Sequence, residues 1–296
     1  MFKINIDNIY VYYKMRTIGV IGNGFVGKVT KILECDEINV IFYDINPECC
    51  NPIGTTLNDI VNCDLIFISV PTPMNPDGSP YLKIVNSVID DISKLVDLNK
   101  TNVVLRSTVT PGTSQSLNCY FMPEFLTEQN CFHDFKTNSD WIFGVKDTEQ
   151  DIQFKETIND IFGLAFNKGL ITSNNIHFIK HSEAEMVKMF RNNFLATKVS
   201  FCNEMYEYCQ HKNIDYDKMR KLACLDKRIG MGHSAVPGPD GQFGYGGTCF
   251  PKDTHSLLND MTKYTKSYVV DSIIRRNEEK DRPDRDWESN KGRSVV

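Results

Sequence analysis

Residues 18–27 read Ile18-Gly19-Val20-Ile21-Gly22-Asn23-Gly24-Phe25-Val26-Gly27, and this stretch decides the fold of the chain. Its apolar start predicts a short strand, and a helix is expected from Lys28 to about Cys35. Between them, Gly22 and Gly24 let the chain turn and let a pyrophosphate approach the backbone, while Gly27 allows close helix–strand packing. The stretch therefore predicts a dinucleotide at a helix N-terminus.

Asp44 ends the next apolar strand, which we expect over residues 38–43. An acid at this spacing binds the adenosine ribose in dinucleotide-binding domains. Because no Arg or Lys follows closely and a 2′-phosphate would be repelled, Asp44 favours NAD over NADP. The alternative is a simple turn residue before Asn46-Pro47, which the upstream glycine motif makes the weaker interpretation.

Further apolar strands are expected over residues 65–70 and 103–105, with a helix over 81–96 between them. Strands that alternate with helices predict an α/β fold with a doubly wound, Rossmann-like parallel sheet, whose ligands lie beyond the carboxyl ends of the strands. Thr72 and Thr108 follow two such ends. Each hydroxyl is about equally expected to cap a helix or to contact a cofactor.

Composition excludes several classes of function. At 296 residues the chain is long enough for two domains, and a net charge of −5 argues against nucleic acid as the main partner. No apolar run approaches the roughly 18 residues of a membrane span, and the first fourteen residues contain no signal-peptide core. The ten cysteines form no CxxC pair, so we expect reduced thiols, no metal site and a cytoplasmic protein.

Two carboxylates, Glu124 and Glu128, stand four residues apart beside Phe125 and Leu126. They would share one side of the chain if the segment were either helical or extended. A solvated edge is the commoner meaning of such a pair. The alternative is a general base whose pKa is raised by burial.

A long helix is expected to begin at Ser182, where Ser182 and Glu185 have the spacing of a capping box. An apolar stripe then recurs at helical spacing and predicts either core or an interface. Its members are Val187, Phe190, Phe194, Phe201, Met205 and Tyr208. Lys188 and Asn192 lie one turn apart on another stripe, where polar residues are normally just solvated.

A glycine-rich loop runs through Gly246-Gly247-Thr248 into Cys249, Pro251 and Lys252. Pro251 predicts that a helix begins just after Cys249. A thiol beside the positive end of a helix and a lysine has a lowered pKa and is a candidate nucleophile. An ordinary loop cysteine is the alternative.

An amphipathic helix is expected from about 254 to 274, and the charged residues beyond it are expected to be disordered.

Five motifs occur in one order: Gly22 to Gly27, Ser107-Thr108-Val109, Pro123 to Glu128, Glu185 through Asn192, and Gly246 to Asp253. Over residues 15–270 the chain thereby resembles the UDP-glucose/GDP-mannose dehydrogenase family, and within it the UDP-glucose 6-dehydrogenases. The resemblance implies an NAD-dependent, four-electron oxidation of a sugar C6 alcohol to a carboxylate. Cys249 matches the family nucleophile that forms a thiohemiacetal and then a thioester.

The resemblance implies a role for each matching residue. Lys188 and Asn192 would stabilise oxygen charge at C6, Glu124 would handle water and protons, and Thr108 and Asp253 would position water. The implied catalytic residues are Cys249, Lys188, Asn192, Glu124, Asp253 and Thr108. The implied NAD-binding residues are Gly22, Gly24, Val26, Gly27, Asp44, Thr72, Thr108, Glu128 and Lys252. The implied substrate-binding residues are Glu124, Phe125, Leu126, Lys188, Asn192, Gly238, Gln242 and Gly246, with Arg228 reaching the substrate across a homodimer.

The residue patterns and the resemblance together predict the domain organisation. We expect an N-terminal extension (1–14), an NAD-binding Rossmann-like domain (15–180), a smaller helical catalytic and dimerisation domain built on the long helix (181–274), and a disordered tail (275–296). The helical domain is expected to mediate the homodimer.

The chain departs from the family in three places. The segment between Asp44 and Asp64 is short, and Cys49 stands where a basic residue commonly supports the NAD phosphates. The family also continues into a second α/β domain that holds the uridine diphosphate, which we expect this chain to lack.

Three functions follow as alternatives. The first is a UDP-glucose 6-dehydrogenase, and the second is a dehydrogenase of GDP-mannose or a UDP-N-acetylhexosamine. The third is a non-catalytic NAD-binding subunit that needs a partner chain. The expected partners are a UDP-sugar and a second copy of the chain, with no nucleic acid and no membrane.

Overall fold

The structure is a computed structural model that describes residues 2–6, 9–13 and 15–296, with side chains from residue 15 onward. The chain divides into two compact units. The first comprises Met1–Pro71 and Leu82–Lys188, and the second comprises Thr72–Tyr81 and Met189–Val296. Each unit is described by itself below.

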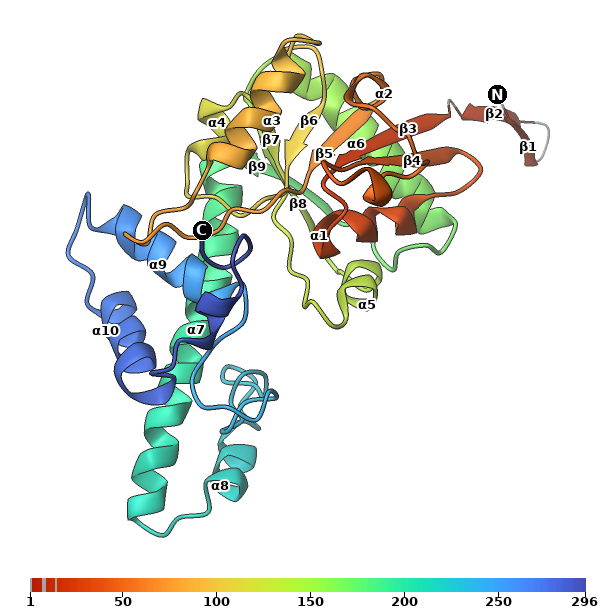
Figure 1. Cartoon of the computed structure of the whole chain (residues 1–296). Helices are drawn as coiled ribbons and strands as arrows, with labels where there is room; N and C mark the ends of the chain where they lie inside the picture. The colour runs from red at the N-terminus through yellow and green to blue at the C-terminus, as the bar shows by residue number, and fades with distance from the viewer. Residues whose placement is uncertain (1, 7–8, 14) are drawn as a thin grey trace. The chain divides into compact units, whose positions relative to one another are not determined.

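A seven-stranded sheet organises the first unit, in the order β4-β3-β5-β6-β7-β8-β9 (Figure 1). Neighbouring strands are parallel except for β7 and β8, which are antiparallel. The predicted doubly wound fold is therefore confirmed, with one antiparallel step that the sequence did not indicate. The strands are β3 Arg16–Ile21, β4 Ile38–Tyr43, β5 Leu65–Ile68, β6 Val103–Leu105, β7 Tyr120–Phe121, β8 Trp141–Val145 and β9 Ile176–Lys180.

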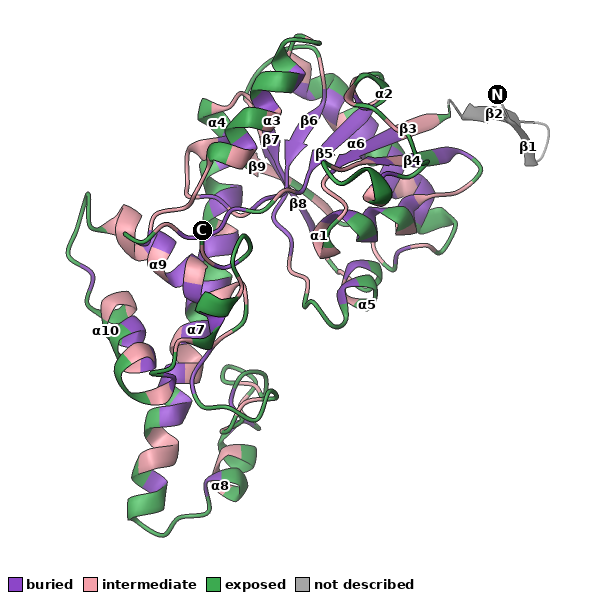
Figure 2. Cartoon of the chain, viewed as in Figure 1, coloured by how far each residue is buried: buried purple, intermediate pink, exposed green. Residues whose placement is uncertain are grey.

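Helices cover both faces of this sheet, and Figure 2 shows its central strands as buried. On one face Phe67 and Tyr120 pack with Phe154 and Ile158 of α6. On the other, Ile66 and Leu105 pack with Val85 and Ile89 of α3. Burial on both faces explains the continuous apolar runs of the parallel strands. The helices are α1 Phe25–Lys28, η1 Val29–Leu33, η2 Pro47–Cys49, α2 Leu57–Val61, α3 Lys83–Ser93, α4 Thr113–Ser116, α5 Cys131–Lys136 and α6 Gln150–Asn167.

A strand–turn–helix forms at residues 16–33, as the glycine spacing predicts, but the helix begins at Phe25 rather than Lys28 and continues as the 3-10 helix η1 to Leu33. Gly22 has a φ of +90°, and a Cβ there would lie 2.6 Å from the carbonyl oxygen of Ser69. A Cβ on Gly27 would lie 1.9 Å from the carbonyl oxygen of Gly22. Only glycine fits at both positions, because each is closed by backbone atoms of the same motif or of the neighbouring strand segment.

The second unit is helical. It contains α7 from Met189 onward, α8 Tyr216–Ala223, α9 Phe250–Met261, α10 Val269–Arg276, η3 Asn277–Asp281 and η4 Asp286–Ser289. Helix α7 spans His181–His211, and its first turns belong to the first unit, where Ala184 and Val187 pack against the sheet core. The division between the units thus falls after Lys188, inside this helix.

The tail is the first of three further departures from the sequence predictions. Residues 275–296 were expected to be disordered, but Asn277 and Trp287 are each 1% exposed and Ser294 is fully buried. The charge of this segment is paired internally, for example in the Arg282–Asp286 ion pair. Composition alone therefore misjudged it, because its few anchoring residues are spaced too widely to show an apolar pattern.

The capping box is the second departure, because Glu185 does not cap its own helix. The fully buried Glu185 carboxylate accepts hydrogen bonds from the backbone N–H groups of Gly112 and Ser114 at the start of α4. The helix start uses Glu183 instead, whose carboxylate accepts from the Lys180 N–H at 3.1 Å.

The third departure is that the single amphipathic helix expected over 254–274 is two helices, α9 and α10, with a break over residues 262–268. The break is rich in Thr, Tyr and Ser, which are weaker helix formers, and all of its residues except Ser267 are exposed.

The remaining observations cover the N-terminal strands, membrane spans, metal sites and cysteines of the described residues. Strands β1 Phe2–Ile6 and β2 Ile9–Tyr13 pair as an antiparallel hairpin within the predicted N-terminal extension, whose residues 1, 7, 8 and 14 lie outside the described residues. Among described residues, no helix has the length and apolarity to cross a membrane, and no cluster of His, Cys, Asp or Glu has the arrangement of a metal site. All ten cysteines are free.

Candidate active site

The first unit contains the residues expected to bind the dinucleotide. Gly24 caps α1 with an exposed backbone, and a Cβ there would meet nothing within 4 Å. The Asp44 carboxylate accepts hydrogen bonds from the backbone N–H groups of Asn23 and Asn46, at 2.8 and 2.9 Å. The open glycine cradle beside a half-exposed acid fits a dinucleotide, with the pyrophosphate at Gly24 and the ribose at Asp44.

The other residues predicted to bind the cofactor lie on separate segments of the chain. Val26 is half-buried in α1, and Thr108 is half-buried just beyond the end of β6. Glu128 is exposed in a loop. Thr72 is buried and belongs to the second unit, as does Lys252. The structure therefore brings together the glycines and Asp44, and places Thr108 and Glu128 on other segments of the first unit.

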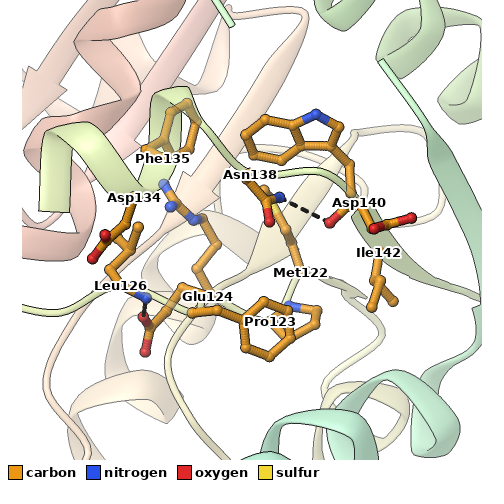
Figure 3. Close-up of a pocket in the computed structure, with 12 residues that line it drawn as sticks. Met122, Pro123, Glu124, Leu126, Asp134, Phe135, Asn138, Asp140 and Ile142 are labelled. Carbon is orange, nitrogen blue, oxygen red and sulfur yellow. Dashed lines mark hydrogen bonds between the residues drawn. The ribbon is translucent and has the colours of Figure 1, made fainter. Parts of the chain in front are cut away.

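Glu124 and Lys188 form a buried ion pair within the first unit. Lys188 Nζ donates to the Glu124 carbonyl oxygen and to Glu124 Oε1, both at 2.7 Å, and the two side chains are 4% and 5% exposed. Glu124 Oε2 accepts from the Leu126 N–H at 2.9 Å, as Figure 3 shows. Lys188 Nζ also lies 5.9 Å from the centre of the Phe125 ring. The structure thus assembles the predicted residues 124–126 and 188.

This cluster corrects two interpretations of the sequence. Lys188 is not solvated, and Glu124 is not part of a solvated edge. The segment that contains Glu124 and Glu128 is neither helix nor strand, so the two carboxylates separate, with Glu124 buried and Glu128 exposed.

Arg106 is a buried residue of this region that the sequence prediction missed. It is 2% exposed, donates from Nη1 to Thr30 Oγ1 at 2.8 Å, and lies over the rings of Phe67 and Phe135. With Glu124 and other residues it lines a cavity of about 20 Å³ (Figure 3). Burial lowers the Arg106 pKa to about 10, against an opposing effect of Glu124. In the sequence, the signal for a buried functional residue was the position of Arg106 directly after the apolar strand β6.

The second unit contains the candidate nucleophile Cys249. Cys249 is half-buried and caps α9, whose first turn contains Pro251, as predicted. Its carbonyl oxygen accepts from the Asp253 N–H at 3.0 Å, and its Sγ lies 3.8 Å from Thr248 Oγ1. The geometry places the sulfur at the positive end of a twelve-residue helix.

Asp253 is the centre of a buried polar group in this unit. Its side chain is 1% exposed, Oδ2 accepts from Asn192 Nδ2 at 2.6 Å, and Oδ1 accepts from Lys252 Nζ at 2.6 Å. Asn192 was interpreted as solvated on sequence grounds alone, and its 7% exposure corrects that. The structure thus brings together Cys249, Lys252, Asp253 and Asn192.

The predicted substrate loop also lies in the second unit. The N–H of Gly238 donates to the carbonyl of Gln242 at 2.8 Å, which closes a tight turn. Gly246 follows in the same loop. Arg228 lies outside this group, and its 89% exposed side chain pairs with Asp226.

A mostly parallel sheet with a glycine turn and an acidic strand end is the arrangement of the dinucleotide-binding class of domains. Residues 52–164 match the NAD-binding domain of the UDP-glucose/GDP-mannose dehydrogenase family, and residues 182–279 match its central domain. These ranges together cover more than half of the chain. The chain therefore belongs to the UDP-glucose/GDP-mannose dehydrogenase family, and NAD is the cofactor of its first domain.

Individual relatives agree with this family. A UDP-glucose 6-dehydrogenase of Rickettsia bellii is 32% identical over 238 residues, which are 75% of this chain and 51% of that protein. One of Campylobacter jejuni is 31% identical over 225 residues, or 73% of this chain and 53% of that protein. The chain spans about half the length of the curated relatives it matches.

A solved structure supports the same relationship. The UDP-glucose dehydrogenase of Pyrobaculum islandicum matches with a TM-score of 0.76 and 25% identity, covering 90% of this chain and 69% of that one. This similarity extends over both the sheet unit and the helical unit.

Proposed function

We propose that the chain is an NAD-dependent nucleotide-sugar 6-dehydrogenase that oxidises the C6 alcohol of UDP-glucose to UDP-glucuronate. The observation that carries the proposal is Cys249 at the N-terminus of α9, in the sequence Gly246 to Asp253. A thiol presented at a helix start is suited to attack a carbonyl carbon. Relatives about 30% identical carry the name UDP-glucose 6-dehydrogenase, which supports this substrate.

In the proposed reaction NAD, when bound, accepts one hydride from C6 at each of two stages. The Cys249 thiolate adds to the C6 aldehyde formed at the first stage and gives a thiohemiacetal. Loss of the second hydride converts this to a thioester, and water then displaces the thiol to release the carboxylate. A thiolate suits both steps, because it adds readily to a carbonyl and leaves readily on hydrolysis.

The remaining roles follow the family resemblance residue by residue. Lys188 and Asn192 supply a cation and an amide donor for the oxygen charge that develops at C6. Glu124 handles the water and its proton, and Thr108 and Asp253 position that water. The buried pairings of Lys188 with Glu124 and of Asn192 with Asp253 hold each donor in one orientation before the sugar binds.

Product stoichiometry tests the proposal. We expect about two NADH per UDP-glucose consumed, measured by absorbance and by chromatography of the nucleotide sugar. A panel that includes GDP-mannose and UDP-N-acetylhexosamines identifies the preferred sugar. Absence of NADH with every nucleotide sugar would refute the proposal.

Cys249→Ser tests the thiol. We expect loss of UDP-glucuronate formation by about a thousandfold or more, since a hydroxyl is a far weaker nucleophile near neutral pH. Cys35→Ser is the matched control, because Cys35 is also half-buried but lies after η1 in the first unit. Near-normal glucuronate formation by Cys249→Ser would remove the thiol from the mechanism.

We further propose a homodimer that forms through α7. Four aromatic side chains on one stripe of this helix are between 55% and 62% exposed: Phe190, Phe194, Phe201 and Tyr208. Such a stripe favours a protein interface, because isolated exposed apolar residues are common but aligned ones are not. Phe201→Glu should yield a monomer in light scattering, whereas Leu222→Glu on α8, also exposed, should not. A monomeric parent protein would contradict the proposal.

We also propose a cytoplasmic location, since ten free thiols in one chain suit a reducing compartment.

A further inference from the structure

The C-terminal segment, defined here as residues 277–296, contacts the loop of residues 238–247 within the second unit. This loop contains the predicted substrate-binding residues Gly238, Gln242 and Gly246. Three polar or aromatic side chains of the C-terminal segment are almost fully buried, with Asn277 and Trp287 at 1% exposure and Arg282 at 5%. Burial of an amide and a guanidinium is costly unless each is paired. Their partners therefore indicate what the segment does.

The side chain of Asn277 both accepts a hydrogen bond from the backbone of the loop and donates one to it. Its Oδ1 accepts from the Tyr245 N–H at 2.8 Å, and its Nδ2 donates to the Tyr245 carbonyl at 2.9 Å. Gly244 has a φ of +65°, and a Cβ there would lie 2.3 Å from Asn277 Oδ1 and 2.9 Å from Asp281 Cβ. The start of the segment thus holds the loop at residues 244 and 245.

Arg282 holds the same loop at two further points. Its Nη2 donates to Asp240 Oδ2 at 2.6 Å and to Asp286 Oδ2 at 2.9 Å. A Cβ on Gly246 would lie 2.6 Å from both Cζ and Nη1 of Arg282. The guanidinium therefore fills the space that any side chain at position 246 would need.

The turn that contains Asp240 depends on this contact. Asp240 Oδ1 accepts from the Gln242 N–H at 3.1 Å, so one carboxylate joins the turn to Arg282. Burial raises the pKa of Asp240, but the hydrogen bonds from Arg282 and Gln242 outweigh it and leave the pKa below its ordinary value. The ionised carboxylate is the form that keeps the turn attached.

The far end of the segment is also tied down. The carbonyl of Ser294 accepts from the Met74 N–H at 2.8 Å, and the Val296 N–H donates to the Met74 carbonyl at 3.1 Å. Both ends of the segment are therefore anchored within the second unit, so Arg282 is presented to the loop by a held backbone.

Arg282 does not have the exposure of a direct phosphate ligand. Its Nη1 is fully buried and has no hydrogen-bond partner, and two carboxylates already flank the guanidinium. A phosphate could not reach Nη1 in this conformation, and it would be repelled by Asp240 and Asp286. Any effect on a ligand must pass through the loop that Arg282 holds.

We propose that Arg282 is a positioning residue for nucleotide-sugar binding. Through Gly246 and Asp240 it holds residues 238–247 in the shape that receives the nucleotide sugar, without touching that ligand. This inference rests on the proposed function, which supplies the ligand class. It also explains why position 246 is glycine, since the close approach of a guanidinium requires it.

A double-mutant cycle tests the contact independently of activity. Gly246→Ala should raise hydrogen-exchange rates of the amides at residues 244–248 by about tenfold or more, or about 1.4 kcal/mol, because the new Cβ would overpack against Arg282. In an Arg282→Ala background the same change should add less than about twofold, because the clashing group is gone. Equal effects in both backgrounds would overturn the contact as the reason for the glycine.

Calorimetric binding to the full chain tests the positioning role. Arg282→Met should weaken UDP-glucose binding by about tenfold and NAD binding by less than about twofold, and Arg282→Lys should recover part of the loss. Arg275→Met is the control, because Arg275 is 62% exposed and pairs with Asp271 on its own helix, α10. It should change neither affinity.

The outcomes separate this inference from the proposed function. If wild-type protein binds UDP-glucose and Arg282→Met binds it equally well, the positioning role is wrong although the function stands. If wild-type protein binds no nucleotide sugar, the proposed function fails and the positioning role falls with it, while the exchange cycle still reports on the contact. Equal losses of NAD and UDP-glucose binding in Arg282→Met indicate general destabilisation and also overturn the role.

Discussion

The chain has two glycine-rich loops, residues 22–27 and 238–247, and they are held in different ways. In the first, Gly27 lies against the carbonyl of Gly22, and Gly22 lies against that of Ser69 at the end of the adjacent strand. In the second, Gly244 lies against Asn277 and Gly246 against Arg282, more than thirty residues further along the chain. The first loop is held by its own strand–turn–helix and by the end of the neighbouring strand. The second loop is held by the C-terminal segment, residues 277–296.

This difference determines how each loop should respond to mutation. A loop closed by backbone atoms cannot relax, because those atoms also hold the sheet. A loop closed by side chains can relax if the side chains move or are removed. Three predictions test this comparison and a fourth tests a contact elsewhere in the first unit, from the largest expected effect to the smallest.

Gly27→Ala should destabilise the protein by about 3 kcal/mol or more, because the new Cβ would lie 1.9 Å from a backbone oxygen. Denaturant unfolding followed by circular dichroism measures this. Gly163→Ala is the control, since a Cβ there meets nothing within 4 Å and Gly163 lies inside α6. A loss below about 1 kcal/mol for Gly27→Ala would show that the first loop also relaxes.

Asn277→Ala should cost about 2–3 kcal/mol, because it leaves the buried N–H and carbonyl of Tyr245 without their partners. The same unfolding measurement applies. Asn259→Ala removes a single exposed hydrogen bond to the Asp77 carbonyl and should cost no more than about 1 kcal/mol. Equal effects of the two changes would argue that the second loop does not depend on the C-terminal segment.

Gly24→Ala should leave stability nearly unchanged yet weaken NAD binding by about tenfold, or about 1.4 kcal/mol. Its φ of −71° suits alanine, and a Cβ there meets nothing within the chain. The methyl group would instead obstruct the approach of the pyrophosphate to the backbone. Fluorescence titration with NAD measures the change, and unaltered affinity would place the pyrophosphate elsewhere.

The buried His181 contacts Cys119, 62 residues away in the sequence of the first unit. Its protonation should have the smallest effect on the free energy of unfolding. His181 Nε2 lies 2.7 Å from the Cys119 carbonyl, and burial, the largest cause, lowers its pKa below 6.5. The unfolded state therefore binds a proton more readily than the folded state near pH 6. The unfolding free energy should thus fall as pH drops below about 6.5, by no more than about 1.4 kcal/mol per pH unit.

His181→Gln keeps an N–H donor but removes the titration, so its unfolding free energy should fall less steeply between pH 7 and 5. Chemical unfolding at several pH values measures both slopes. The exposed His177 pairs with Asp140 at the surface, so His177→Gln provides a control for the loss of a histidine. Identical slopes for the wild type and His181→Gln would contradict the burial effect.

The sequence by itself determined the Rossmann-like sheet, the glycine turn with Asp44, and the start of α9 at Cys249. These depend on local rules: strand apolarity, glycine spacing and a proline in the first helical turn act over a few residues, so they are visible along the chain. The family motifs also picked out Glu124, Lys188, Asn192 and Asp253 as candidates, although their burial was not visible.

Only the tertiary structure decided which of these polar residues are buried and paired. The Lys188–Glu124 contact joins residues 64 positions apart, and Asn192–Asp253 joins residues 61 apart. The order of the C-terminal segment was missed for the same reason. Asn277 contacts Tyr245, and Arg282 contacts Asp240 and Gly246. Contacts between such distant residues leave no periodic pattern in the sequence.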